Sequence, residues 1–472
     1  MRLHYAFLFV PMFAVACTKQ AGPLLDDMPN PAVRQSANGV LATSLTMSNK
    51  SHDIDSGLYL QSASYDGGIP GPTLIVNPGD SLQIALTNNI DLPPNLPVGS
   101  MDPRLSNLHC HGMHVSPLGN SDNPLISMAP GATYNYTMQI PTNHTGGFFW
   151  YHPHHHGTVA WQIANGMQGA IIVRGALDLV PEVAAARDRI LMIANIKLDP
   201  ITGTVPVMTE TAVDLFLVNG KVRPTIHMRP GEVQRWRMCA ASGSRYFPLA
   251  LDSHNLHQIA LDGSPLAAPQ SVSELMLIPG QRAEVLVQAG AVGTYLLRKK
   301  PFQNANMEPA IPEVVLAEIV VSGAPLNMAL PTTLVPVNPD PGAPVALRNW
   351  SFDAISAMPP VFGINMLPFD PTRIDATPLL GSIEEWTIQD GSGMHHPFHL
   401  HTNSFLVTAI NGLPVAMPVW RDTVNVPAYG SVTVKIAFED FPGPTVLHCH
   451  LLEHEDFGMM TIIDTLVTLP PK

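Results

Sequence analysis

A segment near the end of the chain places a cysteine between two histidines and follows them with a third histidine and two methionines. It runs from His448 to Met460 and reads His-Cys-His-Leu-Leu-Glu-His-Glu-Asp-Phe-Gly-Met-Met. A thiolate, two imidazoles and a weak thioether form the ligand set of a blue-copper electron-transfer centre. Cys449, His454 and Met459 supply three of these four ligands, so the segment predicts such a centre.

The same segment predicts a second metal site on its other face. If residues 446–450 are extended, side chains alternate between faces, so His448 and His450 point one way and Cys449 the other. The second site would lie on the order of 10 Å from the thiolate, with a short covalent path for electrons. A buried free cysteine between two surface histidines is the alternative interpretation, and the rest of the chain must decide between them.

The composition favours an all-β protein and excludes several classes of function. Of the 472 residues, 46% are hydrophobic, only 13% are charged and 47 are proline, a balance that fits short strands and fixed turns. This length suffices for two to four domains with cores and excludes a disordered or fibrous chain. The formal net charge of −13 argues against a nucleic-acid partner.

Three turn motifs recur at intervals of about 150 residues. The first is a turn before a strand, at Pro78-Gly79, Pro230-Gly231 and Leu380-Gly381. The second precedes an alternating strand, at Pro130-Gly131, Pro279-Gly280 and Tyr429-Gly430. The third is a glycine that opens a strand, at Gly147, Gly293 and Gly443. Three coincident series predict three all-β sandwich or barrel domains, at residues 35–175, 180–325 and 335–472.

Histidine motifs occupy equivalent places in the first and third repeats, and the second repeat lacks them. They read His109-Cys110-His111, His152-Pro153-His154, His396-Pro397-Phe398-His399-Leu400-His401 and His448-Cys449-His450. Each pair spaced by one residue puts two imidazoles on one strand face. If the outer domains pack together, four such pairs bring eight histidines to one interdomain site, enough for about three copper ions. The middle domain is then a spacer that orients the outer two.

These motifs resemble the signatures of the multicopper oxidase family, namely HxHG, HxH, HPxHxH and HCHxxxHxxxxM. The resemblance covers everything after the N-terminal segment. Within the family, the chain is most similar in kind to bacterial three-domain laccases and copper-efflux cuprous oxidases. It implies three cupredoxin-like Greek-key domains and four copper ions, one of type 1, one of type 2 and a type 3 pair. The reaction it implies couples one-electron oxidation of a donor at type 1 copper to reduction of O₂ to water at the other three.

The resemblance also assigns the ligands. Type 1 copper is assigned to His396, Cys449 and His454 with Met459 axial; type 2 to His109 and His399; and the type 3 pair to His111, His152, His154, His401, His448 and His450. Met460 competes for the axial position, but the family spacing selects Met459. His155 and His156 are expected in the surroundings of the cluster or in a loop.

The chain departs from the family pattern at two places. Position 110 is often tryptophan in relatives, whereas Cys110 stands here and is expected to be a small buried residue facing away from the cluster. Relatives usually carry an acidic residue where this chain has Asn120, and Asp122 two positions on is the substitute proton relay. The family also implies that Glu455 delivers protons to the cluster, with a solvated loop carboxylate as the alternative.

The electron donor is the least determined part of the reaction. Met394, two residues before His396, is a candidate contact for an organic donor or a soft cuprous ion. The 22 methionines are scattered without a methionine-rich insert, which favours a phenolic or aromatic donor over a dedicated cuprous oxidase. A copper-sequestering envelope protein is the non-enzymatic alternative, but sequestration does not need a cysteine flanked by ligands of another site.

The N-terminus predicts export. Arg2, an apolar run over residues 6–16 and small residues before Cys17 read as a secretory signal, and the run is too short to span a bilayer. Residues 14–17 resemble a lipoprotein cleavage box, with Cys17 as the lipidated residue. We therefore expect a monomer in the periplasm or on the outer membrane of a bacterium. With two cysteines assigned, a Cys110–Cys239 bridge is a further possibility without support in the sequence.

Overall fold

The computed structural model describes residues 28–55, 57–92, 101–199, 202–206, 213–305 and 310–468. The expected signal at residues 1–17 and the possible lipid attachment at Cys17 lie outside these ranges. Within them, no helix has the length and apolar character that crossing a membrane requires.

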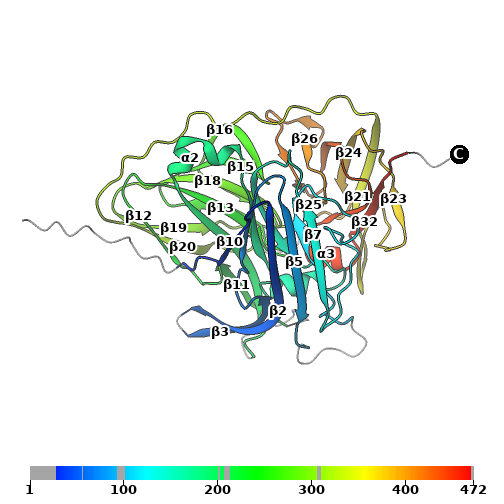
Figure 1. The fold of residues 1–472 in the computed structure, drawn as a ribbon, viewed down its shortest axis with the longest axis horizontal. Helices are drawn as coiled ribbons and strands as arrows, with labels where there is room; N and C mark the ends of the chain where they lie inside the picture. Colours follow the sequence, from blue (N-terminus) through cyan, green and yellow to red (C-terminus); the bar gives the residue numbers. More distant parts are fainter. Residues whose placement is uncertain are drawn as a thin grey trace, which may run out of the picture.

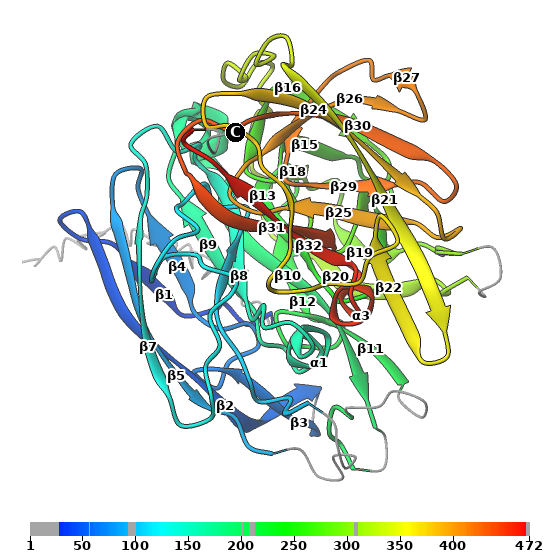
Figure 2. The same cartoon turned by 90° about the vertical axis from the view of Figure 1, so that its right-hand side faces the viewer.

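The described residues form an all-β protein of three cupredoxin-like domains, as expected from the sequence. Six sheets are built from three consecutive segments of the chain, two sheets from each. In Figure 1 most green strands of the middle segment lie to the left of β2 and β5 of the first, and the yellow to red strands of the last lie to the right. Figure 2 shows β31 and β25 of the last segment between the blue strands and the outer strands of their own domain.

The first pair of sheets has strand orders β1-β4-β9-β8-β6 and β3-β2-β5-β7. Its strands are β1 (Val33–Gln35), β2 (Val40–Asp55), β3 (Leu58–Tyr65), β4 (Thr73–Val76), β5 (Ser81–Asn89), β6 (His109–His111), β7 (Thr133–Gln139), β8 (Gly147–His152) and β9 (Gly169–Val173). Helix α1 (Val159–Ala164) follows β8. The connection to the next segment contains a 3₁₀ helix, η1 (Ala176–Leu179), and helix α2 (Pro181–Ala185).

The second pair has orders β11-β10-β13-β18-β15-β16 and β12-β20-β19-β14-β17. Its strands are β10 (Arg187–Leu198), β11 (Val213–Val218), β12 (Thr225–Met228), β13 (Val233–Ala241), β14 (Phe247–Leu251), β15 (Leu256–Leu261), β16 (Ser264–Val272), β17 (Leu275–Leu277), β18 (Arg282–Gln288), β19 (Gly293–Lys299) and β20 (Val314–Val321).

The third pair has orders β22-β21-β24-β30-β26-β27, with β28 beside β26, and β23-β32-β31-β25-β29. Its elements are β21 (Ala346–Ala357), β22 (Pro360–Ile364), β23 (Ile374–Ala376), β24 (Ile383–Asp390), β25 (His396–Leu400), β26 (Phe405–Ile410), β27 (Leu413–Pro414), β28 (Trp420–Arg421), β29 (Thr423–Val426), β30 (Ser431–Ala437), β31 (Gly443–Cys449), α3 (Leu452–Asp456) and β32 (Met460–Thr465). The domain boundaries expected from the sequence stay a proposal.

The repeated turns of the sequence recur as repeated structure. The strands after the first turn, β5, β13 and β24, pair antiparallel with those after the second, β7, β18 and β30. The first two copies of the second turn use a glycine at positive φ, whereas Tyr429 takes that conformation in the third. Alternation explains the strands: in β30 every second residue, Val432, Val434 and Ile436, is fully buried.

Two short helices join the outer domains. Helix α1 of the first packs on helix α3 of the third, side by side in Figure 2. The Asp456 carboxylate of α3 accepts hydrogen bonds from the backbone N–H groups of Gly157, Val159 and Ala160, at 2.7, 3.2 and 2.8 Å. It thereby satisfies free N–H groups at the start of α1, whose N-cap residue, Thr158, makes no side-chain capping bond and donates its hydroxyl to the Leu105 and His155 carbonyls instead. This contact joins the segment that follows His152 and His154 to the segment that contains His454.

Candidate copper sites

Strand β31 carries Cys449 and His448 on opposite faces. Phe398 of β25 pairs with Cys449 and His399 with His448, so the histidines of two neighbouring strands share one face. In the first domain, His109 of β6 pairs with His152 of β8 in the same way. Directly paired residues of adjacent strands lie close enough for their side chains to touch.

On one face of β31, Cys449 lies in a group with two histidines, here called the cysteine site. Sγ of Cys449 is 3.4 Å from Nδ1 of His396 and 3.9 Å from Nδ1 of His454, and the two nitrogens are 3.3 Å apart. A point equidistant from the three atoms lies roughly 2 Å from each, a normal length for metal–nitrogen and metal–sulfur bonds. The spacing therefore fits one metal ion.

Residues next to the cysteine site determine which of its atoms carry protons. Nε2 of His396 is 2.7 Å from Ser392 Oγ and 3.2 Å from the buried Asp390 carboxylate, which favours a proton on Nε2 and leaves the Nδ1 lone pair toward Cys449. Burial opposes ionisation of Asp390, but hydrogen bonds from His396, Tyr429 N–H and Ser392 outweigh it and lower the Asp390 pKa. Burial raises the pKa of the Cys449 thiol, so without a cation the sulfur holds its proton.

The two candidate axial methionines occupy different surroundings. Met459 is fully buried and belongs to the same apolar cluster as Cys449, and its carbonyl accepts the Cys449 N–H at 3.1 Å. Met460 pairs across the sheet with His448 and packs instead with Val446 and Ile462. The packing thus favours Met459 as a ligand at the cysteine site.

On the other face, eight buried imidazoles from both outer domains converge in what we call the histidine cluster. Its members are His109, His111, His152, His154, His399, His401, His448 and His450. Ring centroids of His109 and His401 lie 3.7 Å apart, as do those of His111 and His399, so each stacked pair crosses the interface between the outer domains. Nε2 atoms of His154, His401 and His448 lie 3.1 to 3.3 Å from one another, again a spacing that surrounds one metal ion.

The cluster fits cations because several of its inner nitrogens present a lone pair without a hydrogen-bond partner. Nδ1 of His152 donates to the Pro153 carbonyl at 2.8 Å and Nδ1 of His399 donates to the Asp422 carbonyl at 2.8 Å. A proton on Nδ1 leaves a lone pair on Nε2, and both Nε2 atoms are buried without a hydrogen-bond partner, as is Nε2 of His109. Burial lowers the pKa of all eight, to about 4 for His154 and His448, so the cluster is neutral at pH 7.

Asp122 stands behind the histidine cluster. Its carboxylate is 3.0 Å from Nδ1 of His109 and accepts the Cys110 N–H at 3.0 Å. Burial raises the Asp122 pKa to about 7, with the Cys110 N–H partly opposing the shift. Asn120 is exposed and donates to the Asn135 carbonyl. Asp122 therefore contacts and orients His109, and its expected role as a proton relay stays a prediction.

Glu455 reaches the histidine cluster from helix α3. Its side chain is fully buried, with Oε2 2.9 Å from Nδ1 of His448 and Oε1 3.6 Å from Nε2 of His154. Burial raises the Glu455 pKa to about 7, and the contribution of His154 opposes the shift. The solvated-loop alternative does not describe this residue. A carboxyl whose pKa burial raises to about 7, beside two histidines of the cluster, suits proton transfer.

Other residues singled out from the sequence lie around the two sites. Met394 is partly exposed in the loop before β25, where it bridges to Ala305 of the middle domain. His155 bonds Ser127 through Nε2, and the His156 ring lies 4.6 Å from the Phe369 ring; neither belongs to the cluster. Cys110, Cys239 and Cys449 are buried free thiols among the described residues, and Cys110 Sγ contacts Met138 Sδ at 3.4 Å.

Several functional contacts were not expected from the sequence. Asp422 and Thr423 hold the outer nitrogens of His111 and His399, Asp390 holds His396, and the Phe362 ring stacks on His454 with centroids 4.1 Å apart. The sequence carries no local signal for these contacts, because a charged pair such as Arg421 and Asp422 reads as exposed until the structure shows it buried.

Three segments of the chain match multicopper oxidase domain models, at residues 46–177, 197–323 and 338–467. The chain belongs to the multicopper oxidase family. Among curated relatives, the cell division protein FtsP of Salmonella typhimurium is 28% identical over 424 residues, which cover 83% of each chain.

Two solved structures illustrate the range of relatives. A multicopper oxidase of Campylobacter jejuni, described as a metallo-oxidase, is 25% identical with a TM-score of 0.79, covering 93% of this chain and 96% of its own. A laccase-like multicopper oxidase of Ochrobactrum sp., with activity towards lignin model compounds, is 25% identical with a TM-score of 0.76, covering 93% of this chain and 100% of its own.

Proposed function

We propose that this protein is a four-copper oxidase that couples one-electron oxidation of a small donor to reduction of O₂ to water. The observation that carries the proposal is the double role of strand β31, whose Cys449 belongs to the cysteine site while His448 belongs to the histidine cluster. A copper store needs no such link, whereas an electron relay does.

In this proposal the cysteine site would hold type 1 copper through His396, Cys449 and His454, with Met459 as a fourth ligand. His109 and His399 hold type 2 copper, and the remaining six histidines hold the type 3 pair as two trios. One trio is His154, His401 and His448; the other is His111, His152 and His450, whose ring centroids lie 5.0 to 5.7 Å apart. Copper supplies a reversible one-electron couple at the first site and O₂ reduction at the second.

The chain's own groups supply positioning and protons. Asp122, Asp390 and the carbonyls of Pro153 and Asp422 fix imidazole orientation, which raises ligand basicity and metal affinity. Glu455 is the proton carrier, because its two carboxyl oxygens lie beside His448 and His154 and its pKa is raised to about 7.

The donor is a phenolic or aromatic molecule in our proposal. His396 and Cys449 are fully buried, whereas His454 is partly exposed and its ring is stacked on Phe362, so a donor meets the cysteine site at the His454 edge. A flat aromatic donor matches this aromatic surface. The likeness to the laccase-like oxidase favours a phenolic donor. The likeness to the metallo-oxidase makes a metal ion, contacted by Met394, the second candidate donor.

A non-enzymatic role has one specific argument in its favour, the likeness to the cell division protein. The complete set of buried ligands speaks for catalysis instead. We also propose that the signal-like segment exports the chain, as a monomer, to the bacterial periplasm or, through Cys17, to the outer membrane.

The test is to load the purified protein with copper and record copper per chain, absorption and oxygen uptake. We expect about four coppers, the intense blue absorption of a copper–thiolate centre, and oxygen uptake driven by a phenol more strongly than by Cu(I), Fe(II) or Mn(II). A protein that binds copper but is colourless, or is blue yet consumes no oxygen with any of these donors, would refute the oxidase function.

A further inference from the structure

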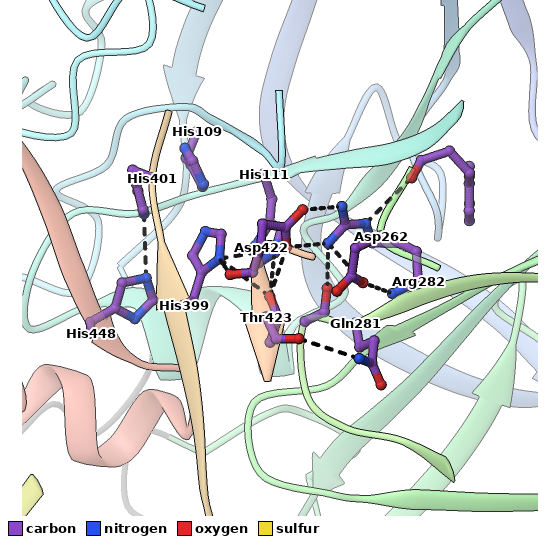
Figure 3. A network of polar contacts seen from close by, with 12 residues as sticks. His109, His111, Asp262, Gln281, Arg282, His399, His401, Asp422, Thr423 and His448 are labelled. Carbon is purple, nitrogen blue, oxygen red and sulfur yellow. Dashed lines mark hydrogen bonds and ion pairs between the residues drawn. The ribbon is translucent and has the colours of Figure 1, made fainter. Parts of the chain in front are cut away.

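The middle domain contributes no histidine to the cluster among the described residues, yet it reaches the cluster through one arginine. Arg282 opens strand β18, its side chain is fully buried, and its guanidinium touches all three domains. It faces the Phe148 carbonyl of the first domain, the Gly280 carbonyl of its own and the Asp422 carboxylate of the third, with Nε and Nη1 donating to the two carbonyls at 3.4 and 3.2 Å. Figure 3 shows Arg282 between Asp262 and Asp422.

The contact with Asp422 has the geometry of a fork. Nη1 donates to Oδ1 at 2.7 Å and Nη2 to Oδ2 at 2.5 Å, while Asp262 Oδ1 lies 3.5 Å from Nη1 and accepts the Arg282 backbone N–H. A bidentate pair fixes the rotation of a carboxylate as well as its position. Lysine offers a single point charge and lacks this geometry.

The fixed carboxylate in turn faces the cluster. Asp422 Oδ1 is 3.2 Å from Nε2 of His111 and accepts the Thr423 hydroxyl at 2.8 Å. Thr423 Oγ1 lies 3.1 Å from Nε2 of His111 and 3.2 Å from Nδ1 of His399. The outer nitrogens of His111 and His399 therefore both contact the segment Asp422-Thr423. Figure 3 shows this segment between the two histidines and Arg282.

Two glycines provide an independent sign that this junction is built tightly. A Cβ on Gly112, the residue after His111, would lie 2.3 Å from Arg282 Nη2 and 2.4 Å from Asp422 Oδ2. A Cβ on Gly280 would lie 2.8 Å from the His450 ring and 3.0 Å from that of His111. Both glycines have positive φ. At Gly112 of the first domain and Gly280 of the middle domain, the backbone therefore lies so close to Arg282, Asp422 and the histidines that no side chain fits.

We propose that Arg282 is a positioning residue of the copper cluster, through which the middle domain fixes the orientation of His111 and His399. With Asp422 held, Nε2 of His111 donates outward and its Nδ1 lone pair, buried without a hydrogen-bond partner, faces inward. His399 is fixed in the opposite sense, with Nδ1 outward and Nε2 inward. The cluster therefore reaches full affinity only when all three domains are docked.

The test compares Arg282→Gln and Arg282→Lys with Arg237→Gln. Arg237 is an equally buried arginine of the same sheet, but it pairs with Asp178, Asp188 and Glu284, away from the cluster. Copper per chain after dialysis against a chelator, the type 2 electron paramagnetic resonance signal and the blue absorption are recorded. Both Arg282 variants should lose cluster copper with about 10- to 100-fold weaker affinity and keep the blue absorption, whereas Arg237→Gln should keep all copper.

Wild-type copper content and an unchanged type 2 signal in Arg282→Gln would overturn the proposal, and so would equal loss of cluster copper in Arg237→Gln. If neither Arg282 variant folds, Asp422→Asn decides: selective loss of cluster copper supports the proposal, and loss of none or of the blue copper as well contradicts it. The inference takes the metal's identity from the proposed function. If the wild type binds four coppers but consumes no oxygen, that function fails while copper retention still decides the role of Arg282.

Discussion

Cys449 and His448 are adjacent in the chain, yet their side chains belong to different groups of ligand atoms. Sγ of Cys449 lies 3.4 Å from Nδ1 of His396, and Nε2 of His448 lies 3.2 Å from Nε2 of His154 in the other domain. Strand alternation produces this arrangement, because successive residues point to opposite faces. The single peptide bond between them is the shortest covalent connection between the two sites.

Cys449→Ser tests the separation of the sites. The hydroxyl is a poor substitute for the thiolate, so the blue absorption and donor oxidation should disappear while the three cluster coppers remain. Copper analysis and the type 2 resonance signal measure this. The matched control is Cys110→Ser, an equally buried thiol that contacts Met138 and should stay blue. Loss of all copper from Cys449→Ser alone would contradict two separate sites.

Glu455→Gln tests the proton carrier. The amide keeps the shape of the side chain but cannot carry a proton, so turnover should fall by about 100-fold while copper content and blue absorption stay unchanged. Steady-state oxygen uptake and reoxidation of the reduced protein are the measurements. Glu453→Gln on the same helix, which removes only the partly exposed pair with Lys197, is the control. Equal turnover of the two variants would remove Glu455 from the mechanism.

Asp122→Asn tests the orientation of His109. The amide has one acceptor oxygen and no charge, whereas both Asp122 oxygens face Nδ1 of His109 and one also accepts the Cys110 N–H. Copper bound by His109 should therefore weaken by about 10- to 100-fold, as measured by the type 2 signal after chelation. Adding Asn120→Asp should not rescue the variant, because Asn120 is exposed and bonded to the Asn135 carbonyl. Rescue by that second change would show that the acid works by charge, without a fixed contact.

The copper-free protein should lose stability in acid. The cluster histidines have pKa values lowered by burial, so their contribution is present above about pH 6.5 and is lost as pH falls through the lowered values, about 4 for His154 and His448. Glu455 and Asp122, with pKa values raised to about 7, act oppositely, since their contribution is present at low pH and lost as pH rises through 7. Burial likewise raises the pKa of Asp456 to about 8 and that of Asp262 to about 7, which makes four carboxyls of this kind. Eight histidines outweigh these four carboxyls, so the urea midpoint should be lower at pH 5 than at pH 7.5; equal midpoints would contradict neutral buried histidines.

Much of the arrangement could be predicted from the sequence because local rules carry it. Alternation placed Cys449 and His448 on opposite faces, and the repeat put the histidines of residues 109–111 and 396–401 at equivalent places. The supports of the ligands could not be predicted, because they come from contacts between distant segments. Arg282 meets Asp422 across 140 positions of sequence, and Asp456 caps α1 from another domain. No local pattern marks such partners, since a charged residue reads as exposed until the docked domains bury it.

The most direct test of the account is the ratio of donor oxidised to oxygen consumed, measured together with hydrogen peroxide. With a one-electron phenolic donor, the copper-loaded protein should oxidise four donor molecules for each O₂ and release no peroxide, because the cysteine site passes electrons through β31 to a cluster that completes the reduction. A ratio of two with stoichiometric peroxide, or donor oxidation without oxygen uptake, would contradict a linked pair of copper sites.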